Sequence, residues 1–266
     1  MGGMLNALRQ KARRLGARIP LGAQRSCCLC GARVRRFLPY RGGWREAPVV
    51  VRTLQVVGSD LDHFSCPACG CHDRERHLWL YLDRLALFAK MRGMALLHFA
   101  PEVALTPFFA RAGLSRHMQA DLFPVREGIE KIDMQATGLP DASFDFVIAN
   151  HVLEHVDDDL HALRELRRVL KPGGSAILQT PYSEVLEHTF SDPGIHSPEQ
   201  RLHLYGQEDH VRLYGRDIFA RFASAGFAAR VVQHEEVLGA VDPVLHGVNP
   251  REPLFLFEAI GGGGAT

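Results

Sequence analysis

The stretch from Phe144 to Thr180 constrains the fold of this chain more than any other part of the sequence. Residues Phe144–Ala149 form a short, almost continuous apolar run, which is typical of a strand covered on both faces. Three aspartates, 157–159, then offer capping groups to a helix with apolar residues at helical spacing. Pro172–Gly174 forbids continuation of this helix, and a second apolar run begins at Ala176. The order predicts a parallel βαβ unit, with a ligand site at the carboxyl ends of its strands.

Composition narrows the class of protein. The chain has 266 residues, 46% of them hydrophobic, which predicts a large core in one large or two unequal domains. Lys and Arg number 31 against 30 acidic residues, so near-neutral charge argues against a general nucleic-acid binder and leaves room only for a local basic patch. No apolar run reaches the roughly 18 residues of a membrane span.

The two ends of the chain differ in character from the rest. The basic segment 1–25 lacks the apolar core of a secretory signal, and Asn6 breaks the myristoylation pattern. We expect a short amphipathic helix or a frayed end there, with attachment to a membrane surface or a partner as the alternative. The glycine-rich tail 261–266 is predicted to be disordered.

All six cysteines lie between Cys27 and Cys71. Without a secretion signal, a cytoplasmic location is expected, and clustered cysteines there indicate a metal site rather than disulfides. Two CxxCG turns supply the candidate ligands, which are Cys27, Cys30, Cys66 and Cys69. Four thiolates fill a tetrahedral shell, so the predicted ion is a structural zinc.

Other residues near these turns leave the exact ligand set open. Cys28 and Cys71 are adjacent thiols, and His63 and His72 are substitutes. Residues 26–72, with β-rich runs at 33–40 and 48–57, look like a zinc ribbon.

A helix is expected over Asp73–Met91, within a connecting segment 73–93. Arg74, Glu75, Arg76 and His77 would form its first turn. We expect this turn to be solvated, with contact to a substrate as the alternative.

The strings SFDFVIANHVLEHV and LRELRRVLKPGG resemble class I S-adenosylmethionine-dependent methyltransferases, most closely the ubiquinone and menaquinone biosynthesis group (methyltransferase type 11). The resemblance spans about Met94 to Ile260. It implies an α/β fold: a Rossmann-like, mostly parallel sheet of seven strands with helices on both faces, preceded by the small β-rich module. The last two strands, predicted at 229–237 and 254–260, would form an antiparallel hairpin.

The expected cofactor loop departs from the family pattern. The first strand is predicted at 94–100, and the family continues there into a GxG loop. This chain has Ala100, Pro101 and Glu102 instead, which we still take as cofactor-binding candidates. Two interpretations of Pro101–Glu102 stay open. They begin a helix, or Glu102 faces the positive charge of the cofactor.

Further cofactor residues follow from the resemblance. A second strand at 117–122 places Asp121 where the family binds the ribose hydroxyls, with Leu122 beside it. A turn-capping role is the alternative for Asp121. A third strand at 129–134 brings Asp133 and Met134 near the adenine. Only about seven residues separate these strands, so the usual crossover helix is expected to be shortened or missing.

Candidate acceptor-site residues follow the fourth strand. His151 is predicted to be the general base, because histidine titrates near neutral pH. Asn150 and His155 join the cofactor-binding candidates, with a structural role as the alternative for His155. A metal held by His151 and His155 has too few ligands.

The long polar insertion 181–213 is interpreted as a substrate lid, because loops of this length are usually functional. Asp209, His210, Arg212 and Tyr214 are the candidate substrate contacts in or next to it. A self-capping surface loop is the alternative. The helix that follows is expected within 215–226.

These patterns predict a zinc-ribbon module followed by a methyltransferase domain at 94–260 that uses S-adenosylmethionine. The acceptor would be a small or polymer-linked molecule, with oxygen the expected target atom. The rival hypothesis is a non-catalytic scaffold or cofactor sensor of the same fold, favoured by the missing GxG. A nicotinamide-dependent oxidoreductase is disfavoured because no GxGxxG follows the first strand.

Overall fold

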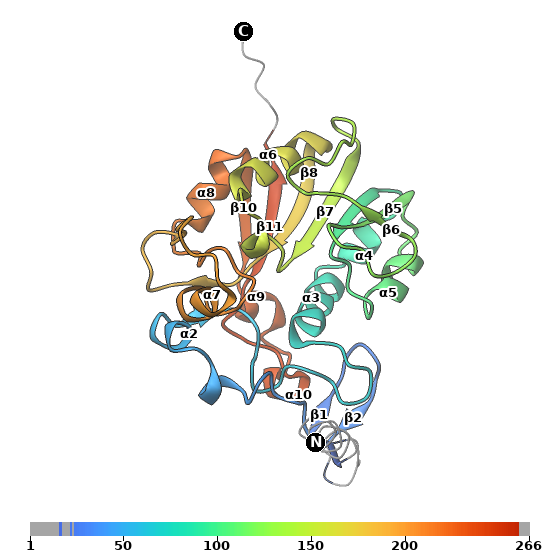
Figure 1. Cartoon of the computed structure of the whole chain (residues 1–266). Coiled ribbons are helices and arrows are strands. Elements are labelled where there is room, and N and C mark those ends of the chain that lie inside the picture. Colours follow the sequence, from blue (N-terminus) through green and yellow to red (C-terminus); the bar gives the residue numbers. More distant parts are fainter. Residues whose placement is uncertain (1–15, 18–21, 23, 261–266) are drawn as a thin grey trace.

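Seven strands in the described part of the chain form the main sheet, in the order β6-β5-β4-β7-β8-β11-β10 (Figure 1). The computed structural model describes residues 16–17, 22 and 24–260, so most of the predicted segment 1–25 and the whole tail 261–266 lie outside the described residues. The strands are β4 (Ala95–Phe99), β5 (Arg116–Asp121), β6 (Ile129–Lys131), β7 (Phe144–Asn150), β8 (Leu170–Gln179), β10 (Phe227–Val232) and β11 (Leu254–Ala259).

The pairing of these strands confirms the predicted fold class. β4 pairs in parallel with β5 and β7, β5 with β6, and β7 with β8. β11 is antiparallel to both β8 and β10. The chain runs from β4 outward to β5 and β6, then returns to β7 on the other side of β4. The gap between the carboxyl ends of β4 and β7 is therefore the switch point where such sheets bind ligands.

The last two strands are separated by two short helices. The predicted strand 229–237 is wrong at its end, because β10 stops at Val232 and His234–Leu238 forms helix α9. A capping box between Gln233 and Glu236 begins this helix. Helix α10 (Pro243–His246) follows before β11.

Helices cover both faces of the sheet, which explains the continuous apolar runs of the central strands. Side chains alternate between faces along a strand. Leu96 and Phe146 belong to one core cluster, with α3, α5 and α9, whereas Leu97 and Val147 belong to the other, with α6 and α8. The bounds are α3 (Asp73–Arg84), α5 (Thr106–Arg111), α6 (Asp159–Val169) and α8 (Ile218–Ser224).

The βαβ unit forms as predicted except at its Pro-Gly-Gly segment. Asp158 caps α6 by accepting a hydrogen bond from the His161 amide at 2.9 Å. β8 then starts at Leu170, not at Ala176, and an irregularity in its pairing with β7 accommodates the turn residues. A Cβ atom at Gly174 would lie 2.9 Å from the Lys171 carbonyl oxygen, so the strand needs glycine there.

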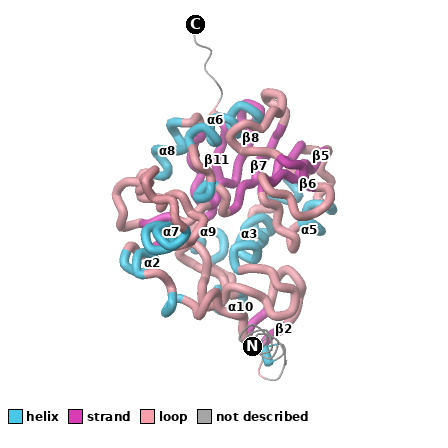
Figure 2. Tube along the Cα trace, viewed as in Figure 1, coloured by secondary structure: helices cyan, strands magenta, loops and turns pink. Residues whose placement is uncertain are grey.

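The N-terminal module contains little regular structure (Figure 2). Its elements are β1 (Arg25–Ser26), β2 (Arg33–Val34), η1 (Trp44–Glu46), α2 (Val49–Thr53) and β3 (Val56–Val57). The predicted β-rich run at 48–57 is wrong over Val49–Thr53, because Pro48 begins a helix that overrides the strand propensity of the valines, whereas Val56–Val57 is a strand as predicted. β3 pairs with β9 (Tyr182–Ser183) in the lid, and α2 packs against lid helix α7 (Pro198–Tyr205). This module therefore extends over the predicted substrate lid.

The connecting segment is interrupted, contrary to the single helix predicted over Asp73–Met91. α3 ends at Arg84, Ala86 takes a left-handed conformation with φ of 53°, and α4 (Leu87–Lys90) follows. No helix in the described part of the chain is long and apolar enough to cross a membrane.

The first turn of α3 buries Asp73, Arg76 and His77 and leaves Arg74 and Glu75 half-buried, so the predicted solvated turn is wrong. Arg76 has no exposed surface, and its guanidinium lies 3.9 Å from the centre of the Phe37 ring. It donates hydrogen bonds to five backbone carbonyls, those of His63, Phe64, Cys71, His246 and Gly247. The guanidinium therefore joins the cysteine module to the segment between β10 and β11.

Asp73 should make stability depend on pH. Burial, and next the nearby Glu252, raise the pKa of the Asp73 carboxyl to about 7. The native state thus holds this proton more tightly than the unfolded chain, so stability is fully present near pH 4 and is lost as pH rises to 7. Asp73→Asn removes this loss while keeping an oxygen for the Asp60 amide, so we expect it to be more stable than wild type by about 2–4 kcal/mol at pH 8 and not at pH 4.

Denaturant unfolding at both pH values measures this difference. Asp83→Asn, at an exposed position of the same helix, is the control and should show no such pH dependence. Equal stability of Asp73→Asn and wild type at pH 8 would contradict the prediction.

Candidate functional site

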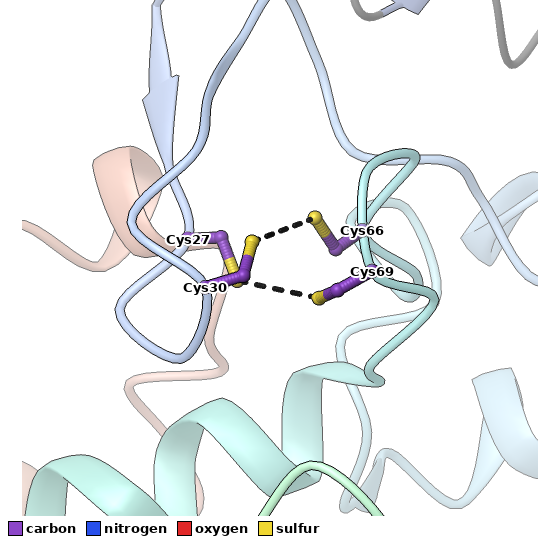
Figure 3. A group of neighbouring side chains, drawn as sticks. All are labelled: Cys27, Cys30, Cys66 and Cys69. Carbon is purple, nitrogen blue, oxygen red and sulfur yellow. Dashed lines mark hydrogen bonds between the residues drawn. The ribbon is translucent and has the colours of Figure 1, made fainter.

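Four cysteines from the two predicted turns converge in the N-terminal module (Figure 3). The Sγ atoms of Cys27 and Cys69 are 3.9 Å apart, and those of Cys30 and Cys66 are 4.0 Å apart. Zinc–sulfur bonds of about 2.3 Å in a tetrahedron place sulfur atoms about 3.8 Å apart. The thiols therefore already have the spacing that a zinc ion requires.

The two turns have the same backbone geometry. The Gly31 amide donates to the Cys27 carbonyl at 2.9 Å, and the Gly70 amide donates to the Cys66 carbonyl at 2.8 Å. Both glycines have left-handed φ values, 71° and 83°, that other residues rarely adopt. The glycine after each CxxC pair is thus needed to close its turn.

Three of the four alternative ligands are engaged elsewhere. Cys28 points to the Arg76 carbonyl at 3.7 Å, and burial raises the pKa of its thiol to about 12. His63 pairs with Asp60, and the ring of His72 stacks on Phe64. Cys71 lies next to the cluster, with its Sγ 3.5 Å from that of Cys27 and 3.8 Å from the Arg76 guanidinium. The predicted four-cysteine set is the one that the geometry brings together.

The residues that directly follow the two central strands are conformationally strained. Ala100 after β4 and His151 after β7 have left-handed φ values of 46° and 57°. Such a backbone costs a non-glycine residue about 1–2 kcal/mol, and strain of this kind concentrates at functional sites. Ala100 therefore makes a turn that glycine usually makes, at the switch point of the sheet.

Glu102 is buried beside this turn and is fully hydrogen-bonded. Its carboxylate lies 2.8 Å from His98 Nε2 and accepts from Asn150 Nδ2 at 2.6 Å. Burial alone would raise the pKa of Glu102, but the bond to His98 and the other contacts lower it. Pro101–Glu102 does not begin a helix, because α5 starts only at Thr106. Glu102 thus joins the ends of β4 and β7 as a buried charge.

Asp121 ends β5, where the predicted ribose ligand belongs. Its Oδ1 accepts a hydrogen bond from the Phe123 amide at 2.8 Å, so the turn-capping role left open by the sequence is also present. Leu122 is 43% exposed beside it. No helix occurs among the described residues 122–128, which confirms that the crossover to β6 lacks one.

The third strand is shorter than predicted. β6 stops at Lys131, and Asp133 and Met134 lie in the turn beyond it. Asp133 caps this turn by accepting from the Gln135 amide at 2.8 Å, while Met134 is buried. The residues predicted to lie near the adenine are therefore in a turn and not in a strand.

A cavity of about 360 Å³ lies between the N-terminal module, the lid and the ends of β7 and β8. His151, Glu154 and Pro181 line it on the side of the sheet. The N-terminal module, the first turn of α3 and the lid supply the other walls, with Tyr40, Trp44, Phe64, Arg74, Tyr205, Gln207 and His210. The cavity thus opens at the position predicted for the methyl acceptor.

His151 is held between two buried carboxylates. Its Nε2 is 3.3 Å from Glu252 and its Nδ1 is 3.4 Å from Glu154. Burial by itself lowers the pKa of His151, but the hydrogen bonds to Glu154 and Glu252 outweigh it and raise the pKa to about 9. Because a general base must start unprotonated, this environment opposes the predicted base role.

Two of the four predicted substrate contacts form hydrogen bonds within the protein instead. Tyr214 has no exposed surface and donates its hydroxyl proton to Asp159 at 2.8 Å, so its prediction as a substrate contact is wrong. Arg212 reaches the cavity wall, but its guanidinium donates to the carbonyls of Leu153 and Asp157, each at 2.7 Å. It therefore holds the turn after β7 in place.

The other candidates meet at the edge of the cavity. His210 is buried in the wall, and its ring centre is 4.8 Å from that of His155. Asp209 lies 3.3 Å from His155 Nδ1. The structure thus groups His155, predicted as a cofactor residue, with two residues of the lid.

Two important side chains were missed from the sequence. Glu252 is buried and contacts His77, His151 and Gln179. It precedes the last strand without any motif, so no local pattern marks it. Arg74 lines the cavity, and the weak signal for it was the alternative, left open above, that the first turn of α3 faces a substrate.

Comparison with known proteins identifies the class. Residues 112–178 match the family model described as Methyltransferase domain. Together with the strand order, this match confirms the resemblance stated above to the class I S-adenosylmethionine-dependent methyltransferases.

Individual relatives are distant. An uncharacterized 37.1 kDa protein of transposon TN4556 from Streptomyces fradiae is 32% identical over 104 residues, which cover 39% of this chain and 30% of that protein. A malonyl-[acyl-carrier protein] O-methyltransferase from Halorhodospira halophila is 29% identical over 140 residues, which cover 50% of this chain and 41% of that protein. This chain therefore spans less than half the length of these curated relatives. A crystal structure of an S-adenosylmethionine dependent methyltransferase from Mesorhizobium loti aligns with a TM-score of 0.47 and 17% identity, over 67% of this chain and 96% of that one.

The strained turn at Ala100 leads to a mutational prediction. Ala100→Gly relieves the left-handed backbone and should stabilise the protein by about 1 kcal/mol. Ala110→Gly, at an exposed site in α5, is the matched control and should destabilise it by about 1 kcal/mol. Urea denaturation measures both changes, and a destabilised Ala100→Gly would show that the turn is not strained.

Proposed function

We propose that this protein transfers a methyl group from S-adenosylmethionine to a hydroxyl oxygen of an acceptor bound in the cavity. The observation that supports the proposal best is the position of the cavity. It meets the carboxyl end of β7, next to the switch point, and His151 lies in its wall. An acceptor there would lie beside a cofactor bound over β4 and β5.

Methyl transfer is an in-line displacement that depends on alignment and exclusion of water. S-adenosylmethionine supplies an electrophilic methyl group on a sulfonium ion. The acceptor oxygen forms the new bond to the methyl carbon, the carbon–sulfur bond breaks, and its electron pair stays on sulfur. After the transfer, the hydroxyl proton would pass to solvent water.

The cofactor would bind at the ends of the first three parallel strands. In this proposal the backbone of Ala100–Glu102 borders its amino acid part, Asp121 binds the ribose, and Asp133–Met134 lie near the adenine. Asn150 orients Glu102 through the observed hydrogen bond. The amide of Phe123 uses only one carboxylate oxygen of Asp121, so the other oxygen would serve the ribose.

His151 is proposed to be a positioning residue rather than the base. Its ring is fixed by Glu154 and Glu252, and its backbone amide donates to Gln179 at 2.7 Å. A fixed imidazolium would orient polar groups of an acceptor and balance the two carboxylates. Its strained backbone, like that of Ala100, is consistent with a functional position.

The walls of the cavity suggest the class of acceptor. Aromatic rings of Tyr40, Trp44 and Tyr205 offer flat apolar surface, while Arg74 and Gln207 offer hydrogen-bond donors. This mixture suits a small or polymer-linked acceptor with a ring and hydroxyl groups. The net charge of +1 makes a nucleic acid the weaker candidate. All six cysteines are free thiols, which supports the proposed cytoplasmic location.

Calorimetry with S-adenosylmethionine and S-adenosylhomocysteine tests the proposal against the non-catalytic scaffold. We expect wild type to bind both, and Asp121→Asn to lose at least about tenfold in affinity, since it removes charge-assisted hydrogen bonds to the ribose. Glu130→Gln, an exposed carboxylate on neighbouring β6, is the control and should bind like wild type. His151→Gln should also keep its cofactor affinity. Absence of binding to wild type would favour the scaffold.

We also propose that the four-cysteine cluster holds one structural zinc. Thiol-specific mercurial treatment should release about one zinc per chain. Cys69→Ser should lose this zinc and more than about 3 kcal/mol of stability, because metal binding contributes directly to folding of such modules. Cys28→Ser is the control and should keep the metal. A folded Cys69→Ser variant with undiminished stability would contradict the structural role.

A further inference from the structure

Three side chains of metal-ligand type converge outside the cysteine cluster. Glu154 and His155 come from the short helix η2 (Leu153–His155) after β7, and His210 comes from the lid beyond α7. One potential ligand atom from each lies within 4.8 Å of those of the other two. The lid thus brings an imidazole from a distant part of the sequence to a Glu-His pair at the end of a central strand.

Backbone contacts hold the two segments together. The amide of Val211, next to His210, donates to the Glu154 carbonyl at 2.9 Å. Arg212 donates to the Leu153 carbonyl at 2.7 Å. The three side chains therefore meet on a fixed frame rather than through flexible surface loops.

Neighbouring groups orient the candidate ligands. Thr180 Oγ1 donates to Glu154 Oε2 at 2.9 Å. Asp209 Oδ2 lies 3.3 Å from Nδ1 of His155, which leaves Nε2 of that ring for a ligand. A carboxylate behind a histidine is the usual second partner of a metal-binding imidazole.

We infer that Glu154, His155 and His210 form a binding site for a divalent transition-metal ion. Two imidazole nitrogens and one carboxylate oxygen suit ions such as zinc or iron(II), and three protein ligands leave coordination positions open. Glu154 and His210 line the cavity, so these open positions face the space proposed for the acceptor.

The charges around the site permit a cation. His151 and Arg212 are the nearby positive groups, but His151 is paired with Glu252 as well as Glu154. The guanidinium of Arg212 donates hydrogen bonds to backbone carbonyls and lies 3.8 Å from the carboxylate of Asp159. The exposed carboxylate of Asp209 adds a further negative charge beside His155.

This site differs in kind from the cysteine cluster. Four sulfur ligands make a closed, structural site, whereas a His-His-Glu set with open positions resembles sites that bind exchangeable ligands. If the proposed methyltransferase function holds, a metal here would bind an acceptor hydroxyl and favour its loss of a proton. This consequence rests on the proposed function, but the metal site itself does not.

Metal titration of the full-length protein tests the inference. After dialysis against a mild chelator that leaves the thiolate zinc in place, we expect wild type to take up one further equivalent of zinc or cobalt(II). His155→Ala and His210→Ala should weaken this second site at least about 100-fold, and Asp209→Asn should weaken it about 10- to 100-fold. His188→Ala is the matched control, a lid histidine whose side chain is 79% exposed, and it should bind like wild type.

Cobalt spectra separate the two sites and guard against misfolding. In a second preparation, stripped of metal at both sites and reloaded with cobalt(II), the cobalt–thiolate charge-transfer band should be the same in every variant, while the d–d bands of the second site should vanish in His155→Ala and His210→Ala. If His210→Ala fails to fold, metal binding by Asp209→Asn tests the inference instead, because Asp209 is exposed and its substitution should not disturb folding. Wild type that takes up no second equivalent, or variants that bind it like wild type, would overturn the inference. Calorimetry with S-adenosylmethionine on the same metal-depleted protein reports separately on the proposed function.

Discussion

One buried guanidinium connects the parts of this protein. Arg76 has no exposed surface and bonds to carbonyl groups of the cysteine module and of the segment before β11. These carbonyls would be left buried without partners if the arginine were absent, which costs about 1–3 kcal/mol for each group. The module is thus docked on the sheet by hydrogen bonds to a fixed charge. This docking places module residues such as Tyr40 and Trp44 in the wall of the cavity, opposite the end of β7.

Buried carboxylates extend this framework to the switch point. Glu252 links His77 of α3 to His151 after β7, and Glu102 links His98 of β4 to Asn150. Burying such charges is unfavourable unless each is paired, so the networks tolerate few other arrangements. They hold two strained turns, at Ala100 and His151, side by side at the ends of neighbouring strands. The proposed cofactor and acceptor sites share this rigid border.

Local sequence patterns predicted much of the fold. The apolar run at Phe144–Ala149, the capping aspartates and the CxxCG turns each specify structure through neighbours in sequence, and the structure contains all of them. The sequence-based predictions were wrong where contacts between residues far apart in the sequence determine the local structure or burial. The valines at 49–51 favour a strand by propensity, yet they lie in α2, which packs on α7. The first turn of α3 is polar in sequence, yet the module covers it.

Short-range spacing and hydrophobic periodicity in the sequence therefore predicted the parallel βαβ unit and the cluster of four cysteines, whereas the family resemblance predicted the seven-stranded sheet. Only the tertiary structure decided which polar residues share a site. Glu252 lies 101 residues beyond His151, and His210 lies 55 residues beyond His155, so neither partner is visible in a local pattern. Their meeting depends on the docking of the module and the lid, where burial forces each charge and each donor to find a partner.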